Sequence, residues 1–351
     1  MKLLRRQGRA TEKVLEQAAS LEEAGRSLEA LDLLLETNRR DASPEIETRI
    51  VQIRNRAFDE LGEPGSDYAA PEGAEFGAAA EEDGLPSLDA SQLSAGAIRS
   101  AFLSHGSLLV RGLCPADAVD TLRTGIDRAF EQRDASAAGA PHSETSHWFN
   151  PFVPDRRFEG AVLLGRSFVG GGSGIWTADS PRMLFELLET FDTLGVREVV
   201  GEYLGERPAI SVNKGTLRRV APTGGTEWWH QDGAFLGEGI RSLNIWLSLT
   251  ASGKDAPGMD VVAKRLDHIV KPGSGGADFD WSLGDDAVRE VAGDTIRRPL
   301  FEAGDALLFD HLHLHRTGTD PGMTKTRYAI ETWFFAPSAY PDPHEQVPLV
   351  Y

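Results

Sequence analysis

The sequence predicts a mainly β protein with helices, an α+β fold. Its core is expected to be a double-stranded β-helix (a jelly-roll or cupin-like fold) with an N-terminal helical extension. Three observations carry this prediction: helical periodicity in residues 1–61, linker composition in residues 62–86, and short β-like runs between glycine- and proline-rich turns in residues 87–351. We therefore expect three parts with these boundaries.

The N-terminal part has apolar residues at helical spacing. The first set is interrupted at Gly25, a second set resumes at Leu28, and a third segment follows the start signal Asp41-Ala-Ser-Pro. The first set is Val14, Leu15, Ala18, Leu21 and Ala24. This predicts a helical hairpin plus a third helix. Such a unit cannot bury its own apolar face, so we expect it to pack on the main domain or on a second subunit, which would make a homo-oligomer.

Residues 62–86 have a different composition. The stretch GEPGSDYAAPEGAEFGAAAEEDGLP is dominated by glycine, alanine, proline and acidic residues. These residues favour a poorly ordered linker over a packed element.

The remaining chain alternates short β-like runs with turns. The runs are SLLVRG, AISVNKGTLRRV, SLNIWLSL, MDVVAKR, ALLFD and YAIETWFF, and helical patterns lie between them at 115–132, 181–203 and 287–291. Many short strands with long insertions favour two packed sheets over alternating βαβ units. The glycine-rich stretch FVGGGSGIW at 168–176 is expected to be a mobile loop over a pocket. It lacks the strand and helix context of a phosphate-binding loop.

Charge and cysteine content narrow the function classes. A formal net charge of −18 with only short basic pairs disfavours nucleic acid and anionic membranes as partners. The single cysteine, Cys114, rules out an internal disulfide and a cysteine-built zinc or iron–sulfur site, and its apolar surroundings predict a core residue. No apolar run approaches membrane-spanning length, and the N-terminus lacks the apolar stretch of a secretory signal. We expect a cytoplasmic protein.

The motif WWHQDGAF is the sharpest local feature. His230 and Asp232 are two residues apart, and on an extended segment such side chains point to the same face. An imidazole nitrogen and a carboxylate oxygen then converge on one ion. A third ligand has to come from elsewhere in the chain.

The third ligand is expected in GDALLFDHLHLHRTG. On a strand, His311, His313 and His315 project to one face. Two histidines and one carboxylate form the facial triad of non-haem Fe(II) oxygenases, which leaves coordination positions open. Nitrogen and oxygen ligands without a thiolate suit Fe(II), although they do not exclude Mn, Co, Ni or Zn.

Arg327 follows His315 by twelve residues, in TKTRYAIETWFF. It shares one face of the expected strand with Ala329, Glu331 and Trp333. A guanidinium that points into an apolar barrel requires a carboxylate partner. The partner is either an internal one, such as Glu331 or Asp305, or a bound dicarboxylate that the guanidinium holds in bidentate fashion.

With these motifs in place, residues 100–336 resemble the phytanoyl-CoA dioxygenase family of Fe(II)/2-oxoglutarate oxygenases, most densely at 218–335. WWHQDGAF is similar to the family's W-H-Q-D block, and SLNIWLSLT to the strand that follows it. APGMDVVAKRLDHIV is similar to the glycine turn and the block after it, but Ala263-Lys264 stands where Pro-Gly is usual. This departure is expected to reshape a loop near the substrate.

The resemblance implies a role for particular residues. His315-Arg316-Thr317 fits the register of the family's distal histidine, so the metal and catalytic set is His230, Asp232 and His315. Arg327 would bind the far carboxylate of 2-oxoglutarate, Thr317 would donate a hydroxyl to it, and Trp246 would form an aromatic wall. His311 and His313 are left as candidates for orienting the ligands.

The implied activity is that of a dioxygenase that uses Fe(II), O₂ and 2-oxoglutarate to hydroxylate a small organic substrate, with release of succinate and CO₂. Because Asp232 is present, hydroxylation is favoured over the halogenation that some family members perform. The substrate pocket is expected at 142–176 and 235–241, with His142, His147, Trp148 and Arg166 as candidate contacts. Two alternatives stay open: a cupin-type metalloenzyme that does not use 2-oxoglutarate, and a non-catalytic jelly-roll binding protein.

Overall fold

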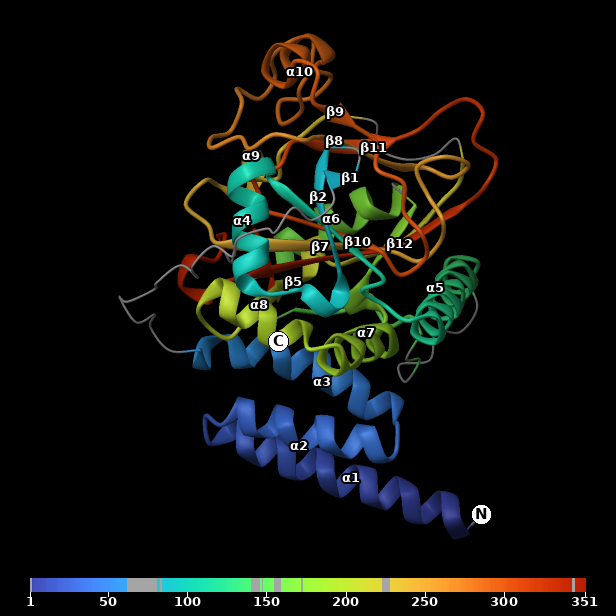
Figure 1. Ribbon diagram of the computed structural model, residues 1–351. Coiled ribbons are helices and arrows are strands. Elements are labelled where there is room, and N and C mark those ends of the chain that lie inside the picture. The colour runs from blue at the N-terminus through green and yellow to red at the C-terminus, as the bar shows by residue number, and fades with distance from the viewer. Residues whose placement is uncertain are drawn as a thin grey trace.

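The computed structural model describes most of the chain (Figure 1). The described residues are 2–61, 81–82, 84–139, 146, 148–154, 159–171, 173–222, 228–342 and 345–351.

Helices occupy the N-terminal part and the segments between strands. The α-helices are α1 (Lys2–Glu23), α2 (Ser27–Arg40), α3 (Pro44–Arg56), α4 (Ala95–His105), α5 (Ala116–Ala137), α6 (Glu159–Gly171), α7 (Pro181–Thr193), α8 (Val196–Leu204), α9 (Gly233–Leu236) and α10 (Asp285–Ala292). Short 3₁₀ helices are η1 (Ala57–Glu60), η2 (Ala90–Gln92), η4 (Thr177–Asp179), η5 (Val212–Lys214) and η6 (Pro337–Ala339).

Strands dominate from residue 81 onward. They are β1 (Glu81–Glu82), β2 (Leu85–Asp89), β3 (Ser107–Arg111), β4 (Gly174–Trp176), β5 (Ala209–Ser211), β6 (Thr216–Val220), β7 (Ser242–Ser248), β8 (Gly258–Val262), β9 (Ile296–Arg297), β10 (Ala306–Phe309), β11 (His315–Gly318), β12 (Arg327–Phe335) and β13 (Pro348–Val350).

These strands form two sheets, which confirms the predicted α+β jelly-roll fold. The larger sheet has ten strands, in the order β1-β2-β3-β10-β7-β12-β5-β13, with β6 also paired to β12 and β4 to β6. The smaller sheet is β11-β8-β9. Among the described strands, pairing is antiparallel except between β2 and β3. In Figure 1 the smaller sheet and α10 lie at the top, the larger sheet below them, and α7, α8 and the N-terminal helices at the bottom.

Side-chain alternation along β7 shows how the chain builds two cores. Leu243, Ile245 and Leu247 point into the core between the larger sheet and the helices. Trp246 points the other way, into the space between the two sheets, where it meets Met259 of the smaller sheet. The strand is buried on both faces, as expected for the centre of a layered domain.

The N-terminal helices pack on the main body of the protein. Phe185 of α7 enters the apolar core of α1–α3. Arg54 and Asn55 of α3 donate to backbone oxygens of β13, at 2.6 Å from Val350 O and 2.8 Å from Pro348 O. The turn at Gly25 has a positive φ of 70°, which suits glycine and explains the interruption in the pattern. The predicted homo-oligomer stays a prediction.

The structure differs from the prediction in two segments that we expected to be irregular, the linker and the glycine-rich loop. Most of the expected linker, residues 62–80 and 83, lies outside the described residues, but Leu85 and Pro86 already belong to β2. The expected mobile loop at 168–176 is wrong, since 168–171 end α6 and 174–176 form β4, paired with β6. A Cβ atom on Gly174 would lie 2.8 Å from Val169 Cγ1, so glycine serves close helix–strand packing here.

One of the expected β-like runs is divided into two strands. AISVNKGTLRRV, expected as one β-like run, forms β5 and β6 with η5 between them. Cys114 is a core residue as predicted, 3% exposed, and its burial raises the pKa of the thiol to about 11.

Within the described part of the chain, none of the helices has the length and apolar character needed to cross a membrane.

Candidate metal centre

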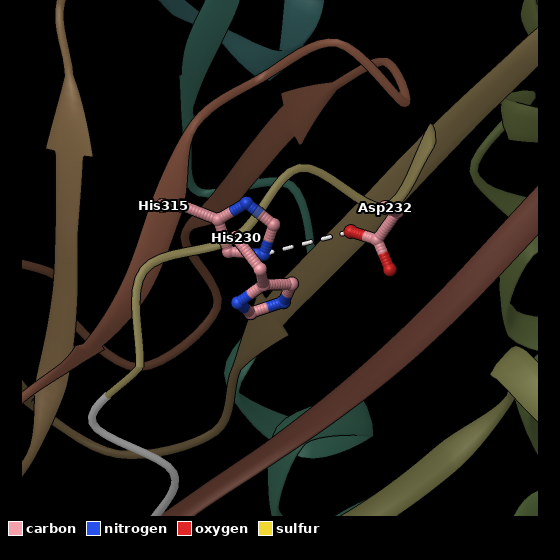
Figure 2. A group of neighbouring side chains, drawn as sticks. All are labelled: His230, Asp232 and His315. Carbon is pink, nitrogen blue, oxygen red and sulfur yellow. Dashed lines mark ion pairs between the residues drawn. The ribbon is translucent and has the colours of Figure 1, made fainter. Parts of the chain in front are cut away.

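His230 and His315 are held side by side by the backbone. The two residues form an isolated antiparallel bridge: His230 N donates to His315 O at 3.0 Å, and His315 N donates to His230 O at 3.1 Å. Their ring centroids lie 4.4 Å apart. Residues directly opposite in such a bridge project side chains to the same face, so both imidazoles point toward Asp232 (Figure 2).

Asp232 reaches the histidines by a different route from the one expected. Its backbone is helical (φ −62°, ψ −27°) at the start of α9, so the prediction of an extended His230–Asp232 segment is wrong. The helical turn still aims the carboxylate at the pair, with Asp232 Oδ2 3.7 Å from His315 Nε2. One ligand atom from each of the three residues lies within 4.8 Å of the others, so the group could hold a metal ion.

The neighbouring residues fix this turn. Gly233 N donates to His311 O at 2.8 Å, and a Cβ atom on Gly233 would lie 2.5 Å from Ile269 Cδ1. The same Cβ atom would lie 3.1 Å from His311 O, so a larger residue would be crowded here. Gln231, 1% exposed, donates through Nε2 to Leu312 O at 2.7 Å and accepts from Val270 N at 2.8 Å. Gln231 thus connects its own segment with the loops that contain Val270 and Leu312, next to the candidate ligands. The sequence did not indicate this role.

Each histidine has a fixed ring orientation. His230 Nδ1 lies 2.9 Å from Trp228 O, and His315 Nδ1 lies 3.0 Å from His313 O. A carbonyl oxygen only accepts, so both Nδ1 atoms carry the proton and donate. The Nε2 atom of each ring is then unprotonated, so its lone pair is available to a metal, which is the usual arrangement for ligating histidines.

The site is in the protonation state that metal binding needs. Burial, and then the neighbouring His315, lower the pKa of His230 to about 4. Burial alone would raise the pKa of Asp232, but Lys214 and the two histidines outweigh it and lower that pKa to about 2. At neutral pH His230 is therefore neutral and Asp232 is a carboxylate.

The structure separates the three histidines of DHLHLH. The prediction that all three lie on one strand is wrong, because β11 begins at His315 and residues 311–312 form a turn. His311 is bonded instead to Ser242 Oγ at 3.0 Å and Glu238 O at 3.2 Å. His313 stacks on His315 with ring centroids 6.1 Å apart, and neither of its ring nitrogens has a partner among the described residues.

Arg327 is buried and forms no ion pair with a carboxylate of the described residues. It is 4% exposed, its Nη1 donates to Gly258 O at 3.1 Å, and its guanidinium lies 5.5 Å from the Trp246 ring centroid. Its Nε has no hydrogen-bond partner in the described part of the structure. Burial, followed by nearby Arg218, lowers the pKa of Arg327 to about 9, which leaves the side chain cationic at neutral pH.

Neither internal partner considered for Arg327 forms an ion pair with it, although the charge of Glu331 partly offsets the lowering of its pKa. Glu331 faces Arg218, with Glu331 Oε2 3.4 Å from Arg218 Nη2. Asp305 pairs with Arg111 at 2.5 Å between Oδ2 and Nη1. The described residues therefore contain no ion pair for Arg327.

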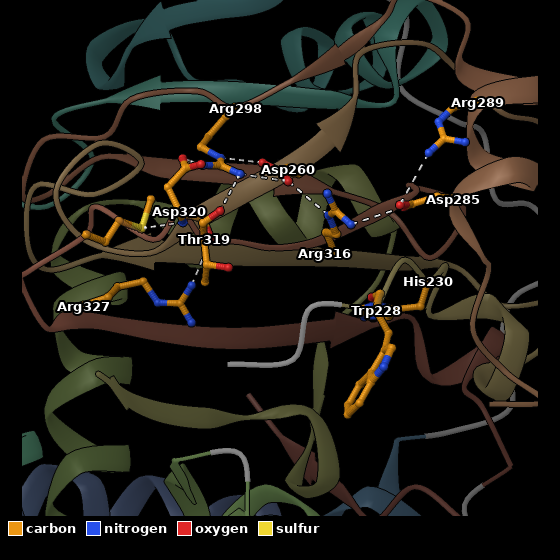
Figure 3. Close-up of polar contacts among 12 residues, drawn as sticks. Trp228, His230, Asp260, Asp285, Arg289, Arg298, Arg316, Thr319, Asp320 and Arg327 are labelled. Atoms are coloured by element: carbon orange, nitrogen blue, oxygen red, sulfur yellow. Dashed lines mark hydrogen bonds and ion pairs between the residues drawn. The ribbon is translucent and has the colours of Figure 1, made fainter. Parts of the chain in front are cut away.

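An ion network supports the strand that carries His315. Figure 3 shows Asp260 of β8 between Arg298 and Arg316. Arg298 Nε lies 2.5 Å from Asp260 Oδ1, and Arg316 Nε lies 3.0 Å from Asp260 Oδ2. Arg316 follows His315 directly, so this buried carboxylate ties β11 to β8 beside the candidate metal ligands.

The predicted site residues surround one cavity of about 510 Å³. All six predicted site residues line it: His230, Asp232, His315, Arg327, Thr317 and Trp246. Other lining residues include Gly165, Phe168, Val169, Lys214, Arg218, Phe235, Met259 and Trp281.

Only some residues of the expected substrate-binding segments line the cavity. Phe168 and Val169 come from the expected segment 142–176, and Phe235 from 235–241. Trp148, however, stacks under Arg128 at 5.0 Å, and Arg166 pairs with Asp179 at 2.8 Å. His142 and His147 lie outside the described residues. Lys214 and Trp281 were missed, because the fold brings them in from segments without a recognisable motif.

Comparison with known proteins gives similarity of fold only. The sequence matches no family model and no curated protein sequence. Among solved structures, the chain is similar to EctD from S. alaskensis with 2-oxoglutarate and 5-hydroxyectoine (18% identity, TM-score 0.47, 78% of this chain and 89% of that chain). It is also similar to EvdO2 from Micromonospora carbonacea var. aurantiaca (16%, 0.44, 72% and 91%). A third is SnoK, a non-heme alpha ketoglutarate dependent carbocyclase from nogalamycin biosynthesis (13%, 0.43, 71% and 86%).

Proposed function

We propose that this protein is an Fe(II)- and 2-oxoglutarate-dependent oxygenase that hydroxylates a small organic substrate with O₂ and releases succinate and CO₂. The observation that carries the proposal is the shared cavity. A His-Asp-His group opens into the same space as a buried arginine that has no carboxylate partner among the described residues.

His230, Asp232 and His315 would hold Fe(II). The donor set fits, because two imidazoles and one carboxylate without a thiolate form the facial triad that suits this metal. Bound there, Fe(II) would supply the redox chemistry that couples decarboxylation of 2-oxoglutarate to oxidation of a C–H bond.

Arg327 would bind the far carboxylate of 2-oxoglutarate. A dicarboxylate supplies the negative charge that the buried guanidinium lacks, and charge-assisted hydrogen bonds are strong in such an environment. Thr317 lines the same cavity and would add a hydroxyl donor, while the Trp246 ring lies beside the guanidinium and would form a wall.

The part of the cavity lined by Phe168, Phe235 and Trp281 would receive the substrate. Phe168 and Phe235 both meet Trp281 edge-on, at centroid distances of 6.4 Å and 6.2 Å. Phe235 and Trp281 lie beside His230, at ring-centroid distances of 6.4 Å and 5.9 Å, whereas Phe168 is 58% exposed. Aromatic rings at this position favour a substrate with an apolar surface. With 2-oxoglutarate also inside about 510 Å³, the substrate has to be small.

The resemblance to the phytanoyl-CoA dioxygenase family supports the same proposal through its motifs. Asp232 occupies the position that halogenating members of that family leave free, so we propose hydroxylation. Turnover in chloride should give no chlorinated product, and such a product would refute this part of the proposal. We further propose a three-part organisation of N-terminal helices, linker and oxygenase domain, in which the domain begins with β1 and β2 and so before the expected residue 87. We also propose a cytoplasmic location in keeping with the single cysteine.

The test is 2-oxoglutarate turnover by the purified protein with Fe(II) and O₂, measured as succinate release and screened for stimulation by small organic compounds. Arg327→Ala should raise the KM for 2-oxoglutarate at least tenfold. A cupin-type enzyme of another class would keep its activity in Arg327→Ala. A non-catalytic binding protein would bind no stoichiometric iron, and either result would reject the proposal.

A further inference from the structure

Lys214 lies beside the candidate metal ligands without belonging to them. It ends η5, the turn that divides β5 from β6, and its Nζ lies 2.7 Å from Asp232 Oδ1. The same Nζ lies 3.9 Å from the ring centroid of Phe235, over the ring face. The lysine side chain is 18% exposed, so the ion pair is largely shielded from water.

The two oxygens of Asp232 are used differently. Oδ1 accepts from Lys214, whereas Oδ2 has no hydrogen-bond partner among the described residues and faces His315 Nε2 at 3.7 Å. Asp232 also precedes α9, where an aspartate commonly accepts from a backbone N–H, but its side chain makes no such bond. One oxygen of the carboxylate therefore contacts the lysine, and the other faces the histidine pair.

Phe235 makes this arrangement rigid. It lies in the same helical turn as Asp232, with Phe235 N donating to Asp232 O at 3.2 Å. Lys214 therefore contacts both the ligand carboxylate and the aromatic ring of the turn that presents it. A cation over an aromatic face and a charged hydrogen bond together restrict rotation of the carboxylate.

We propose that Lys214 is a positioning residue that holds Asp232 to a single metal-binding oxygen and so keeps a coordination position open. The inference rests on the proposed metal centre. Aspartate can bind a metal through one oxygen or through both. With two histidines and one oxygen, an octahedral ion keeps three positions, whereas a two-oxygen aspartate leaves only two. A chelating cosubstrate would then fill the site completely.

The alternative is that Lys214 serves only as a counter-ion for a buried carboxylate. That role requires a positive charge nearby but says nothing about how many oxygens bind the metal. A count of the metal's open positions therefore separates the two readings, and activity alone does not.

The experiment uses Mn(II) as the probe and measures the water-proton relaxation that the bound ion causes, which reports the water molecules in direct contact with it. Four full-length proteins are compared: the wild type, Lys214→Met, Lys214→Arg, and Lys13→Met as a matched control. Lys13 is an exposed lysine of α1, far from the cavity. Unfolding of each protein is followed by circular dichroism, and Lys214→Leu, which also lacks a hydrogen-bond donor, replaces the methionine variant if that variant does not fold.

We expect the relaxation due to directly bound water to fall by about one third in Lys214→Met, as three open positions become two. Lys214→Arg, which keeps a cationic donor, should restore most of it, and Lys13→Met should equal the wild type. Equal values in the wild type and Lys214→Met would overturn the inference.

Failure of the proposed function gives a different pattern. If the wild type binds no stoichiometric Mn(II), the metal centre and the lysine inference fall together. If it binds Mn(II) but 2-oxoglutarate displaces no water, the oxygenase proposal fails, while the comparison with Lys214→Met still decides the role of the lysine.

Discussion

Arg327 is the residue that separates this cavity from an ordinary polar pocket. Burying an unpaired charge is unfavourable, so we expect a guanidinium without an ion pair in the described structure to destabilise the ligand-free protein. Under the proposed function, binding of 2-oxoglutarate accounts for the buried arginine, whereas folding does not.

Replacement of Arg327 by methionine tests this explanation. We expect Arg327→Met to raise the thermal midpoint of the ligand-free protein, with a gain in unfolding free energy of roughly 1 kcal/mol. The stabilisation that 2-oxoglutarate gives the wild type, about 2.7 kcal/mol at a hundredfold excess over Kd, should disappear. Differential scanning fluorimetry with and without 2-oxoglutarate measures both effects.

Arg289→Met is the matched control for that measurement. Arg289 is 66% exposed on α10, with exposed acidic partners, so its loss should change the midpoint little and leave the 2-oxoglutarate shift intact. A lower midpoint in Arg327→Met would mean that the arginine stabilises the fold, contrary to this account.

Cys114 offers a second test at the residue scale. Because burial raises its pKa to about 11, roughly one thiol in a thousand is ionised at pH 8, compared with about a quarter of free cysteine side chains. We expect labelling by a thiol reagent at pH 8 to be at least a hundredfold slower in the native protein than in denaturant. Labelling at equal rates would place Cys114 outside the core.

At this scale the sequence predicts residues that carry a motif and misses those that do not. His230, Asp232 and His315 were chosen because their spacing and neighbours follow a known register, and the structure brings them together. Lys214 and Trp281 reach the same cavity from η5 and from the loop before α10. Their positions depend on tertiary contacts that leave no periodic signal in the chain.

At the scale of elements, β11 depends on Asp260. The carboxylate is 5% exposed and is bonded to Arg298 and Arg316, so its loss leaves two guanidinium groups without their main partner. We expect Asp260→Asn to lower the unfolding free energy by about 2 kcal/mol. It should also weaken metal binding, because β11 begins with His315.

Urea unfolding and Mn(II) titration check the two effects of Asp260→Asn. The control is Asp286→Asn on α10, whose side chain is 84% exposed and should change stability by less than about 0.5 kcal/mol. A stable Asp260→Asn protein with unchanged metal affinity would show that the network does not position β11.

Elements with a clear period were predicted well, and those set by context were not. β7 and β12 carry alternating apolar residues, and both are strands. α6 was missed because glycines hide its apolar pattern, and the division of 209–220 into β5, η5 and β6 follows from pairing with β12. The turn at 311–312 overrides the alternation of His and Leu, which a strand would also produce.

At the scale of the whole molecule, the N-terminal helices and the jelly roll share one structure. Phe185 joins the core of α1–α3, and buried Arg54 bonds the final strand. We therefore expect the amides of α2 and α3 to exchange hydrogen with nearly the same opening free energy as those of β7 and β12. Hydrogen exchange followed by mass spectrometry measures this.

Removing the connecting ring should uncouple the two parts. Phe185→Ala is expected to cost about 3 kcal/mol and to speed exchange in α2 and α3 more than in β7. Leu103→Ala on α4, where the side chain is 58% exposed, is the control and should leave exchange unchanged. Fast exchange of α2 and α3 already in the wild type would show that the helices form a separate unit.

The overall topology was predicted in class but not in detail. Short strands, turn residues and the absence of βαβ alternation were enough to predict a jelly roll. The order β3-β10-β7-β12 joins strands that are far apart in the chain, and no local pattern encodes such pairings.

The central claim is that one cavity holds Fe(II) and 2-oxoglutarate together. The most direct measurement is the visible absorption spectrum of the protein with Fe(II) under anaerobic conditions, before and after 2-oxoglutarate is added. We predict a weak charge-transfer band that needs both components, saturates at one equivalent of each, and is lost in His315→Ala. The absence of that band in a protein that binds stoichiometric Fe(II) would contradict the account.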